Sequence, residues 1–539
     1  MESFDKIINM KNMEKKSYQR DGVEWLLSNE LRMDSPFGIK GGFVADEMGL
    51  GKTIMMIGLC YANFKNKTLI VVPPVLIEQW YKQIYRLTGH KCVVYHGKNK
   101  KKINENINIL KDAAVKIVLC SYDAISIKVD KNDKNKKFKE NETDSTAVTT
   151  SLISSSSNQV SVLHGITWGR VIFDEAHHLR NKKTTRFLGA KILRSNIKWL
   201  VSGTPVQNKK QDFYALCSLI NLPLSYCREP SNLDEISRFF ILRRTKKQVG
   251  IDLDDAIDTR KVVSWKNSSE LLLAKEIHSA FSFANVILRE ENENENENGK
   301  IGVDVDEKTT VDSHELIDVM LERGYGKLPL LLRARQSCIY PKMMQNKIQF
   351  FKNLGLIKDN DDIYDDAMKS SSKLDSVVEA ILLRSDNGNG KLVFCHFSEE
   401  MNVISKRLLE ADPALNIGIL DGKTTMRKRT KMIEEKKDVL IMQIQTGCEG
   451  LNLQDNYSEI YFVSPHWNPY VEDQAIARCH RIGQKKPVYV WRFEMDNFGV
   501  ASVGSGADVE NGGIVTKNLD EYVTDVQNGK RLVVSRIIE

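Results

Sequence analysis

Paired cysteines are missing from this sequence. Its 539 residues include nine cysteines, and no two of them stand in a C-x-x-C arrangement. Zinc modules of the RING and ribbon types use such pairs as ligands, and small secreted domains use closely spaced cysteines to build a disulfide framework. We therefore expect reduced, buried thiols, no zinc module and no disulfide-stabilised fold.

Long apolar runs are missing as well. No run of about 18 apolar residues occurs, and the N-terminus "MESFDKIINMKNMEKK" lacks the uninterrupted apolar segment of a secretory signal. We expect a protein that does not cross a membrane, is not secreted and works inside a cell. The net charge of +7 is compatible with a phosphate-bearing partner but does not select one.

Short apolar segments occur in two sets. The first set lies at 41–46, 68–74, 116–121, 170–175 and 198–204. The second set lies at 390–397, 416–422, 438–444, 459–465 and 487–493. Amphipathic stretches separate most of these segments, and buried strands that alternate with helices form parallel sheets covered on both faces. The sequence predicts an α/β protein with two doubly wound parallel-sheet lobes.

The other segments predict how the lobes are joined. A Lys/Asn-rich and then Ser/Thr-rich insert at 128–163 is predicted to be disordered, and the acidic repeat at 290–299 and the segment 497–513 are predicted to be surface loops. We divide the chain into an N-terminal lobe, a helical bridge, a C-terminal lobe, and an inserted loop with a closing helix, at 1–240, 241–370, 371–495 and 496–539.

The segment "ADEMGLGKT" follows a predicted strand and precedes an apolar, helix-like stretch. Gly49 and Gly51 allow backbone N–H groups to converge on phosphate oxygens at the start of a helix. Lys52 supplies a cation for the β and γ phosphates, and Thr53 supplies a hydroxyl for Mg²⁺. Asp46 stands where the G-x-x-x-x-G-K-[ST] pattern has its first glycine. The segment predicts a nucleotide-binding loop rather than a glycine-rich turn with an incidental lysine.

The stretch "VIFDEAHHLRN" places Asp174 and Glu175 directly after an apolar strand. A phosphate loop needs one carboxylate for Mg²⁺ and a second to orient or deprotonate the attacking water, so we assign Asp174 to the metal and Glu175 to the water. Zinc binding by His177 and His178 is disfavoured, because such pairs on a helix need i, i+4 spacing. We expect His177 to sense the nucleotide state and His178 to be a surface or packing residue.

With these motifs the chain resembles the SNF2 family of ATPases, the double-stranded-DNA translocases of helicase superfamily 2. In that family "DEMGLGKT" is the usual phosphate loop and the carboxylate box reads D-E-x-H. The similarity covers residues 15–495 and includes "SYQRDGVEWL", "LIVVPPVLIEQW", "SGTPVQN", "LLLRARQSCIYP", "LDGKTTMRKR" and "HWNPYVEDQAIARCHRIGQ". "NLDEYVTDVQNGKRLV" resembles the closing brace helix. The resemblance implies two RecA-like lobes joined by a helical bridge, with ATP and Mg²⁺ as cofactors.

The family's motifs assign functional residues to matching positions. The expected catalytic residues are Lys52, Asp174, Glu175, Arg478 and Arg481. The expected nucleotide-binding residues are Gln19, which would read the adenine, Asp46, Gly49, Gly51, Lys52, Thr53, His177 and Gly450, with Thr53 and Asp174 on the magnesium ion. The expected DNA-binding or coupling residues are Pro73, Gln79, Ser121, Tyr122, Ser202, Thr204, Thr446, Asn452 and Trp467.

Arg478 and Arg481 are expected on one face of a helix, because they are spaced i, i+3. The resemblance makes them arginine fingers that reach the γ-phosphate when the second lobe closes on the first. A salt-bridged helix surface is the disfavoured alternative. Trp467 matches a family position that couples DNA to ATP turnover, and simple packing is an equally open explanation of this residue.

The resemblance implies a DNA-dependent ATPase that moves along duplex DNA and remodels protein–DNA complexes or chromatin. Contacts to backbone phosphates carry no sequence information, so we expect non-specific, salt-dependent binding. A strand-separating superfamily 2 DNA or RNA helicase and a transcription-termination or release ATPase stay open as alternatives. An inactive DNA-binding scaffold is disfavoured, because the catalytic residues are all present.

The stretch "ITWGRVIFDEAHHLRN" favours the Rad5/Rad16-like or transcription-termination-factor-like branch, here without a RING module and without ubiquitin ligase activity. The expected partners are double-stranded DNA and, beyond it, nucleosomes or transcription and repair proteins. We expect a monomeric motor that does not bind a membrane. Its expected location is the nucleus or, for a viral protein, the virion or the viral replication site.

Overall fold

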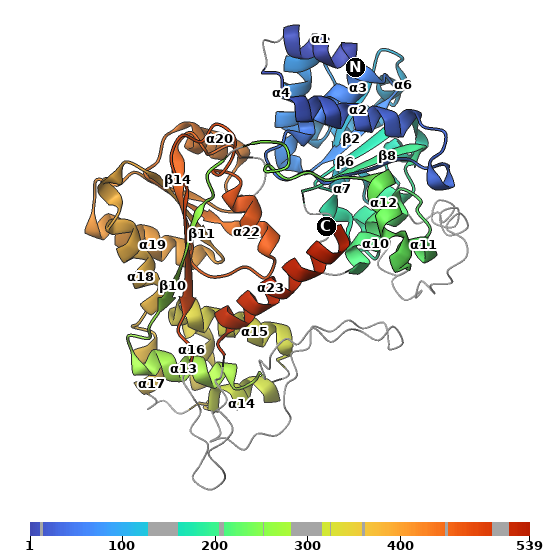
Figure 1. The fold of residues 1–539 in the computed structure, drawn as a ribbon. Coiled ribbons are helices and arrows are strands. Elements are labelled where there is room, and N and C mark those ends of the chain that lie inside the picture. The colour runs from blue at the N-terminus through green and yellow to red at the C-terminus, as the bar shows by residue number, and fades with distance from the viewer. Residues whose placement is uncertain are drawn as a thin grey trace. The chain divides into compact units, whose positions relative to one another are not determined.

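The computed structural model describes residues 1–10, 14–127, 160–203, 210–251, 253–281, 315–323, 325–357, 362–447, 451–498 and 517–538. The chain divides into two compact units. The first comprises Met1–Leu253 with Val533–Glu539, and the second comprises Asp254–Leu532. Each unit has its own parallel sheet (Figure 1).

The sheet of the first unit has seven strands in the order β3-β4-β2-β6-β8-β1-β9, and its strand pairs are parallel. The strands are β1 Lys40–Val44, β2 Thr68–Val72, β3 Val93–Tyr95, β4 Ile117–Ser121, β6 Arg170–Asp174, β8 Ile197–Val201 and β9 Ile241–Leu242, and a separate pair is formed by β5 Thr167–Trp168 and β7 Arg194–Ser195. Because the strands are parallel, the loops after β1, β6 and β8 begin at the same edge of the sheet.

Helices cover both faces of this sheet. On one face α1 Glu2–Met10, α2 Ser17–Leu31, α3 Lys52–Ala62 and α4 Ile77–Thr88 share a core with the strands, and Trp80 and Trp199 are buried in it. On the other face α10 Lys210–Leu219 packs against β1, with the rings of Phe213 and Phe43 5.6 Å apart. The remaining helices of the unit are α5 Gly97–Glu105, α6 Asn108–Lys111, α7 Tyr122–Ile125, α9 Thr185–Lys191, α11 Leu224–Arg228 and α12 Leu233–Phe240.

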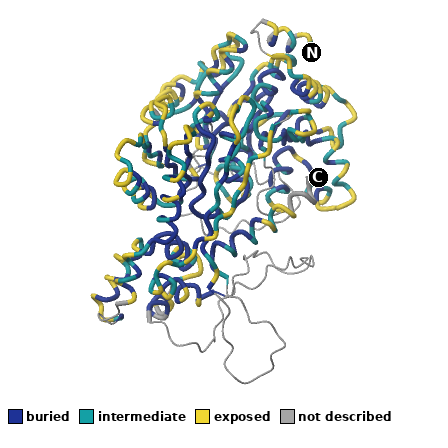
Figure 2. The backbone as a smooth tube through the Cα atoms, turned by 60° about the vertical axis from the view of Figure 1, so that its left-hand side comes forward, coloured by how far each residue is buried: buried dark blue, intermediate teal, exposed yellow. Residues whose placement is uncertain are grey.

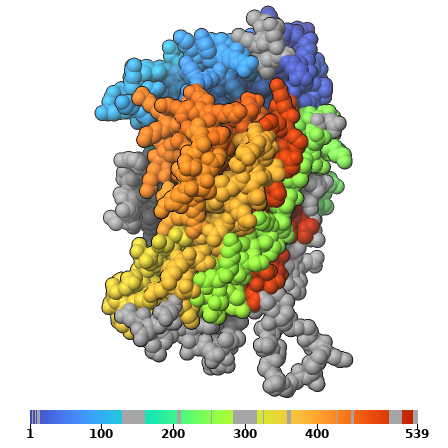
Figure 3. Space-filling model, turned by 90° about the vertical axis from the view of Figure 1, so that its left-hand side faces the viewer, coloured from blue at the N-terminus to red at the C-terminus, as the bar shows by residue number. Residues whose placement is uncertain are grey.

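The sheet of the second unit has six parallel strands in the order β10-β15-β14-β11-β13-β12. They are β10 Ile257–Val263, β11 Gly390–Cys395, β12 Ile417–Leu420, β13 Val439–Gln443, β14 Tyr457–Phe462 and β15 Tyr489–Met495. The inner strands β11 and β14 are buried along their whole length, whereas most residues of the edge strand β10 are exposed or half-buried (Figure 2). Part of the green segment that includes β10 and α13 lies at the surface in Figure 3.

A second core in this unit is built mainly from helices and, among the described residues, contains no strand residue. It joins buried side chains of α13 Ser268–His278, α14 Glu315–Glu322, α15 Lys327–Ile339, α16 Gln345–Asn353, α17 Asp362–Ala367 and the start of α23 Leu519–Ile538. The helices around the sheet are α18 Ser372–Leu382, α19 Ser398–Ala411, α20 Met426–Glu434, α21 Ile444–Gly447 and α22 Pro469–Ile476.

The two parallel sheets confirm the predicted fold class, and each of the ten predicted strands corresponds to an observed strand. The strands β3, β9 and β10 and the short pair β5–β7 were not predicted. β3 has only three residues, and β10 carries polar residues at several positions because it lies at an edge. Apart from 160–163 and 497–498, the three predicted inserts lie outside the described residues, and the four-part division of the chain stays a prediction. Among the described residues, the helices are too short or too polar to span a membrane.

Candidate active site

The loop between β1 and α3 folds around Lys52, the first residue of α3. The Lys52 Nζ donates to the carbonyl oxygens of Asp46 at 2.7 Å and Glu47 at 3.2 Å. These bonds hold the ammonium group over the loop. Thr53 is the second residue of the helix, so its backbone N–H is one of those that the α-helical ladder leaves without a partner.

Two glycines give this loop its shape. Gly49 and Gly51 have φ values of 94° and 81°, in the left-handed region that favours glycine. A Cβ on Gly51 would lie 2.4 Å from Nε2 of Gln19, so a larger residue here would also displace the Gln19 side chain. Gln19 is buried, and its Nε2 donates to the carbonyl of Leu50 at 3.3 Å. The predicted adenine-reading residue therefore lies directly against the loop.

Asp46, which replaces the first glycine of the pattern, has a fully buried carboxylate. Arg244 Nε and Nη2 donate to its two oxygens at 3.1 and 2.5 Å, and Arg244 Nη1 donates to the carbonyl of Tyr18 at 2.5 Å. The Asp46 side chain is thus engaged in tying the loop to the segment after β9. Its backbone carbonyl, by contrast, faces Lys52.

Asp174 ends β6, and its carboxylate is buried. Trp80 Nε1 donates to Oδ2 at 2.7 Å, and the backbone N–H of Glu175 donates to Oδ1 at 3.0 Å. Desolvation and then the neighbouring Glu175 raise the pKa of Asp174 well above its usual range, while the Trp80 hydrogen bond and the ammonium of Lys52 oppose the shift. The Tyr122 hydroxyl holds the same residue by donating to its carbonyl at 2.6 Å.

Glu175 has a φ of 51°, an unusual left-handed conformation for a residue other than glycine. Its Oε2 lies 3.3 Å from Nδ1 of His177, and the same ring nitrogen lies 3.3 Å from the hydroxyl of Ser202. Ser202 directly follows β8, the neighbour of β6. The His178 ring lies between those of His177 and Tyr122, at 4.8 and 5.3 Å. Polar contacts therefore run from Glu175 to the start of the "SGTPVQN" motif.

These residues fit a magnesium–nucleotide complex. Lys52 begins the helix that follows β1 and Asp174 ends β6, and only β8 separates these two parallel strands, so the cation and the carboxylate lie at the same edge of the sheet. The Thr53 hydroxyl and the Asp174 carboxylate are hard oxygen ligands of the kind Mg²⁺ prefers. The left-handed glycines shape the loop that leads into α3, and the first N–H groups of a helix are the ones that can donate to a phosphate.

The predicted DNA contacts of the first unit lie at the same edge of the sheet. Pro73 directly follows β2, and Gln79 lies in the first turn of α4. Ser121 ends β4 and Tyr122 follows it, and each of these two residues is only 2% exposed, backbone included. In this structure the pair therefore offers almost no surface to DNA. Thr204 lies outside the described residues.

The arginine pair of the second unit is not on a regular helix, which corrects the i, i+3 prediction. α22 ends at Ile476, and Arg478 and Arg481 follow in a run of turns. The backbone N–H of Arg478 donates to the carbonyl of Ala475, three residues back, so the i to i−4 ladder has already tightened there. Among the described residues neither guanidinium has a carboxylate in an ion pair, and Arg478 Nε is buried without a hydrogen-bond partner.

Arg481 is held by a hydrogen bond from Nη1 to Oδ1 of Asn452. Burial and the charge of Arg478 lower the pKa of Arg481, so the two guanidinium groups repel each other. Thr446 lies in α21, Gly450 lies outside the described residues, and Trp467 is half-buried before α22. A bound anion would relieve the repulsion between the two arginines.

Sequence reasoning missed two residues of the site. Trp80 donates to the Asp174 carboxylate, although only Gln79 beside it was selected. Arg244 holds Asp46 across 198 residues of sequence. The sequence contains these residues in "QW" and "LRRT", but neither fragment identifies the partner of its side chain. The partners are distant in sequence and meet only when the sheet brings the segments together.

Two family models match this chain. The SNF2-related domain matches residues 18–297, and the helicase conserved C-terminal domain matches residues 372–483. Among solved structures, a Sulfolobus solfataricus SWI2/SNF2 ATPase core in complex with double-stranded DNA is 19% identical, with 89% of this chain and 88% of that chain covered and a TM-score of 0.36.

Several curated proteins are similar at comparable identity. The DNA excision repair protein ERCC-6-like of Bos taurus is 26% identical over 88% of this chain and 39% of its own length. The probable global transactivator of Orgyia pseudotsugata multicapsid polyhedrosis virus is 26% identical over 89% of this chain and 86% of its own length. The DNA repair protein RAD5 of Candida albicans is 24% identical over 88% of this chain and 56% of its own length.

This chain spans well under half the length of the ERCC-6-like relatives. Relatives of different names match at nearly equal identity, so the comparisons do not select the Rad5/Rad16-like branch. The match to the SNF2-related domain covers more than half of the sequence. The chain belongs to the SNF2-related ATPase family and carries a helicase conserved C-terminal domain.

Proposed function

We propose that this protein is an ATP-dependent motor that moves along double-stranded DNA and remodels protein–DNA complexes. The observation that carries the proposal is the position of Lys52, after β1, and of Asp174 and Glu175, at the end of β6, at the carboxyl edge of one parallel sheet. Membership of the SNF2-related family supports the choice of duplex DNA as the track.

Each candidate site residue of the first unit is assigned a role in ATP hydrolysis. Lys52 and the N–H groups at the start of α3 bind the phosphates, and Thr53 and Asp174 would hold Mg²⁺. When bound, the ion neutralises charge on the phosphates. Glu175 orients the attacking water and accepts its proton. Gln19 contacts the adenine.

We assign Arg478 and Arg481 to the γ-phosphate, because the two guanidinium groups repel each other and the nearby Asp455 carboxylate only partly offsets this repulsion, so the pair favours an anion. His177 and Ser202 relay the nucleotide state from Glu175 toward the DNA-contacting motifs. The remaining predicted contacts grip backbone phosphates, so the motor does not read base sequence. The cellular task, the nuclear or viral location and the monomeric state stay predictions.

The test is ATP hydrolysis by the wild type and by Glu175→Gln without nucleic acid and with duplex DNA, single-stranded DNA or RNA. We expect duplex DNA to stimulate the wild type most and the variant to lose roughly a thousandfold or more of the turnover. Asp123→Asn, an exposed carboxylate in the same unit that pairs with Arg186, is the matched control and should hydrolyse ATP normally.

Other outcomes would select another function. Strongest stimulation by single strands or RNA, with strand separation, would replace the translocase by a helicase, the activity named for the relative DDM1 of Arabidopsis thaliana. A folded wild type that binds duplex DNA but never hydrolyses ATP would be a scaffold.

A further inference from the structure

Helix α23 presents two different faces within the second unit. Its apolar side chains are buried in the helical core of that unit: Leu519, Tyr522 and Val523. Its polar side chains recur at spacings of four, three and four residues and so share one face: Asp520, Thr524, Gln527 and Arg531. The polar face binds segments that follow β14, as the contacts of individual residues show.

Gln527 and Lys530 hold the loop between β14 and α22. Gln527 Nε2 donates to the carbonyl of His466 at 2.5 Å, and Lys530 Nζ donates to the carbonyl of Trp467 at 2.6 Å. Two consecutive carbonyls of the "HWNP" loop are therefore fixed by one helix that lies more than 50 residues away in the sequence.

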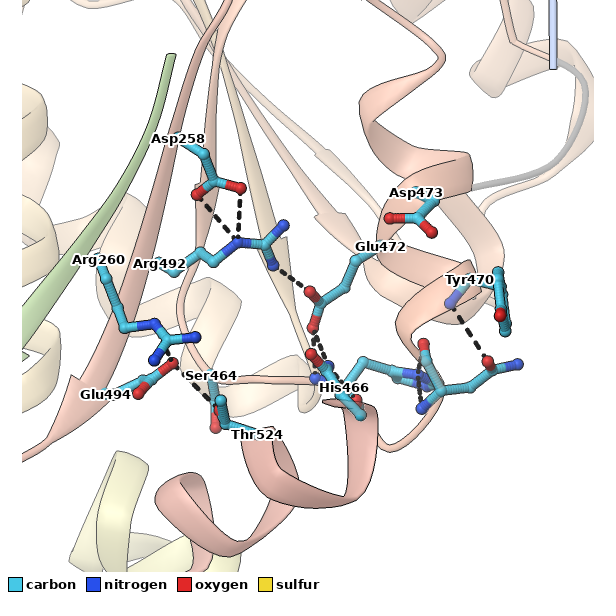
Figure 4. Close-up of polar contacts among 12 residues, drawn as sticks. Asp258, Arg260, Ser464, His466, Tyr470, Glu472, Asp473, Arg492, Glu494 and Thr524 are labelled. Atoms are coloured by element: carbon cyan, nitrogen blue, oxygen red, sulfur yellow. Dashed lines mark hydrogen bonds and ion pairs between the residues drawn. The ribbon is translucent and has the colours of Figure 1, made fainter. Parts of the chain in front are cut away.

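The same helix also anchors the start of α22. Glu472 is fully buried, and its Oε1 accepts hydrogen bonds from Gln527 Nε2 at 2.8 Å and from the backbone N–H of His466 at 2.7 Å. Its Oε2 accepts from Arg492, which Asp258 holds in turn (Figure 4). Because a buried carboxylate is costly unless its oxygens are bonded, this network fixes the position of α22.

The ring of Trp467 is held as well. The Arg335 guanidinium lies over it at 5.4 Å, and the Tyr522 ring of α23 meets it edge-on at 6.1 Å. Arg335 is 7% exposed, its Nη1 lies 3.1 Å from Nδ1 of His396, and the cation–π contact with Trp467 is a further interaction of this charge. α22 then leads directly to Arg478 and Arg481.

We propose that Gln527 and Lys530 are positioning residues that couple DNA binding at the Trp467 loop to the arginine pair after α22. This inference rests on the proposed motor function. With these two contacts intact, a displacement of the loop by DNA is transmitted to α22. Without them the loop moves independently, and DNA no longer accelerates hydrolysis.

The experiment compares Lys530→Met and Gln527→Leu with the wild type in the full chain. We expect the ratio of duplex-stimulated to basal ATP hydrolysis to fall by about fivefold or more, while basal turnover and the KM for ATP stay within about twofold. Lys530→Arg, which keeps a donor, should restore much of the ratio. Asn528→Ala, an exposed neighbour on the same helix, is the matched control.

Hydrogen exchange at the His466 and Asn468 amides tests the positioning without DNA, and both amides should exchange faster in Lys530→Met and Gln527→Leu. Unchanged exchange, or equal loss of basal and stimulated hydrolysis, overturns the coupling role. A wild type that duplex DNA does not stimulate refutes the proposed function instead, and the exchange data then still decide whether α23 holds the loop.

Discussion

At the scale of single residues, the environment of Asp174 determines what the site can bind. Its carboxylate is desolvated and lies beside Glu175, so its pKa is raised, while Trp80 and Lys52 stabilise the charged form. Mg²⁺ requires the deprotonated carboxylate. The Trp80 indole therefore supports metal binding although it would not touch the ion.

Trp80→Phe removes this hydrogen bond and should raise the pKa of Asp174 further. Because the charged form is then lost at a higher pH, we expect the acid limb of ATP hydrolysis to shift upward and magnesium affinity to fall about tenfold. Hydrolysis measured from about pH 6 to 9 at several magnesium concentrations checks this. Trp168→Phe, which removes an indole donor to the carbonyl of Leu163, should leave the pH profile unchanged.

Lys198 of β8 predicts a pH-dependent stability. Burial and then the charge of Lys191 lower the pKa of Lys198 to about 7. The unfolded chain keeps the Lys198 proton up to about pH 10. Between about pH 7 and pH 10 unfolding therefore takes up a proton, so the free energy of unfolding rises with pH in this range.

Lys198→Met removes the burial penalty of this amine. We expect the variant to be more stable than the wild type by a few kcal/mol near pH 7, with a smaller rise in stability toward pH 9. Thermal unfolding at both pH values measures this, and Lys101→Met, a change at an exposed lysine, is the control. A variant that is less stable than the wild type at pH 7 would show that the amine is not destabilising.

At the scale of elements, one buried ion pair joins β6 to α2. Arg170 Nε and Nη2 donate to the two oxygens of Glu30 at 2.6 and 2.5 Å, and both side chains are fully buried. Trp199 of β8 and Asn63 after α3 donate to the same carboxylate at 2.8 and 2.6 Å. Strand and helix segments of the first unit thus share a single charged centre.

Arg170→Met leaves the Glu30 carboxylate buried without its cation, and we expect a loss of about 3–5 kcal/mol in the free energy of unfolding. Arg170→Met with Glu30→Leu removes both charges and should regain much of that loss. Denaturant unfolding of both variants provides the measurement. The single variant Glu30→Leu completes the cycle, and if the double variant loses as much stability as the two single variants together, the pair is not the coupled unit that the geometry indicates.

At the scale of the whole molecule, a motor that tracks along duplex DNA should respond to the length of its track. At saturating DNA we expect the rate of ATP hydrolysis to be low on a duplex of about 20 base pairs and to reach a plateau on long or circular duplex. On a short duplex the motor soon reaches an end and dissociates, whereas on a long track it continues to hydrolyse ATP. Raising salt from about 50 to 200 mM should increase the half-stimulating DNA concentration tenfold or more. Equal rates on short and circular duplex would contradict translocation.

The sequence was sufficient to predict the ten strands named at the outset, because buried parallel strands are continuous apolar runs bounded by loop residues. It also led us to select Lys52, Asp174 and Glu175 from local spacing at strand and helix ends, and their catalytic roles stay predictions. It did not predict β10, whose polar residues are typical of an edge, or the end of α22 before Arg478.

The sequence by itself determined the family, the phosphate loop and the carboxylate box, because each is a short motif whose chemistry requires particular residues at fixed spacing. Only the tertiary structure decided that Trp80 would bind Asp174, that Arg244 would hold Asp46, and that Gln527 and Lys530 would grip the loop before α22. The physical reason is distance along the chain, because such partners meet only when sheets and helical cores bring remote segments together.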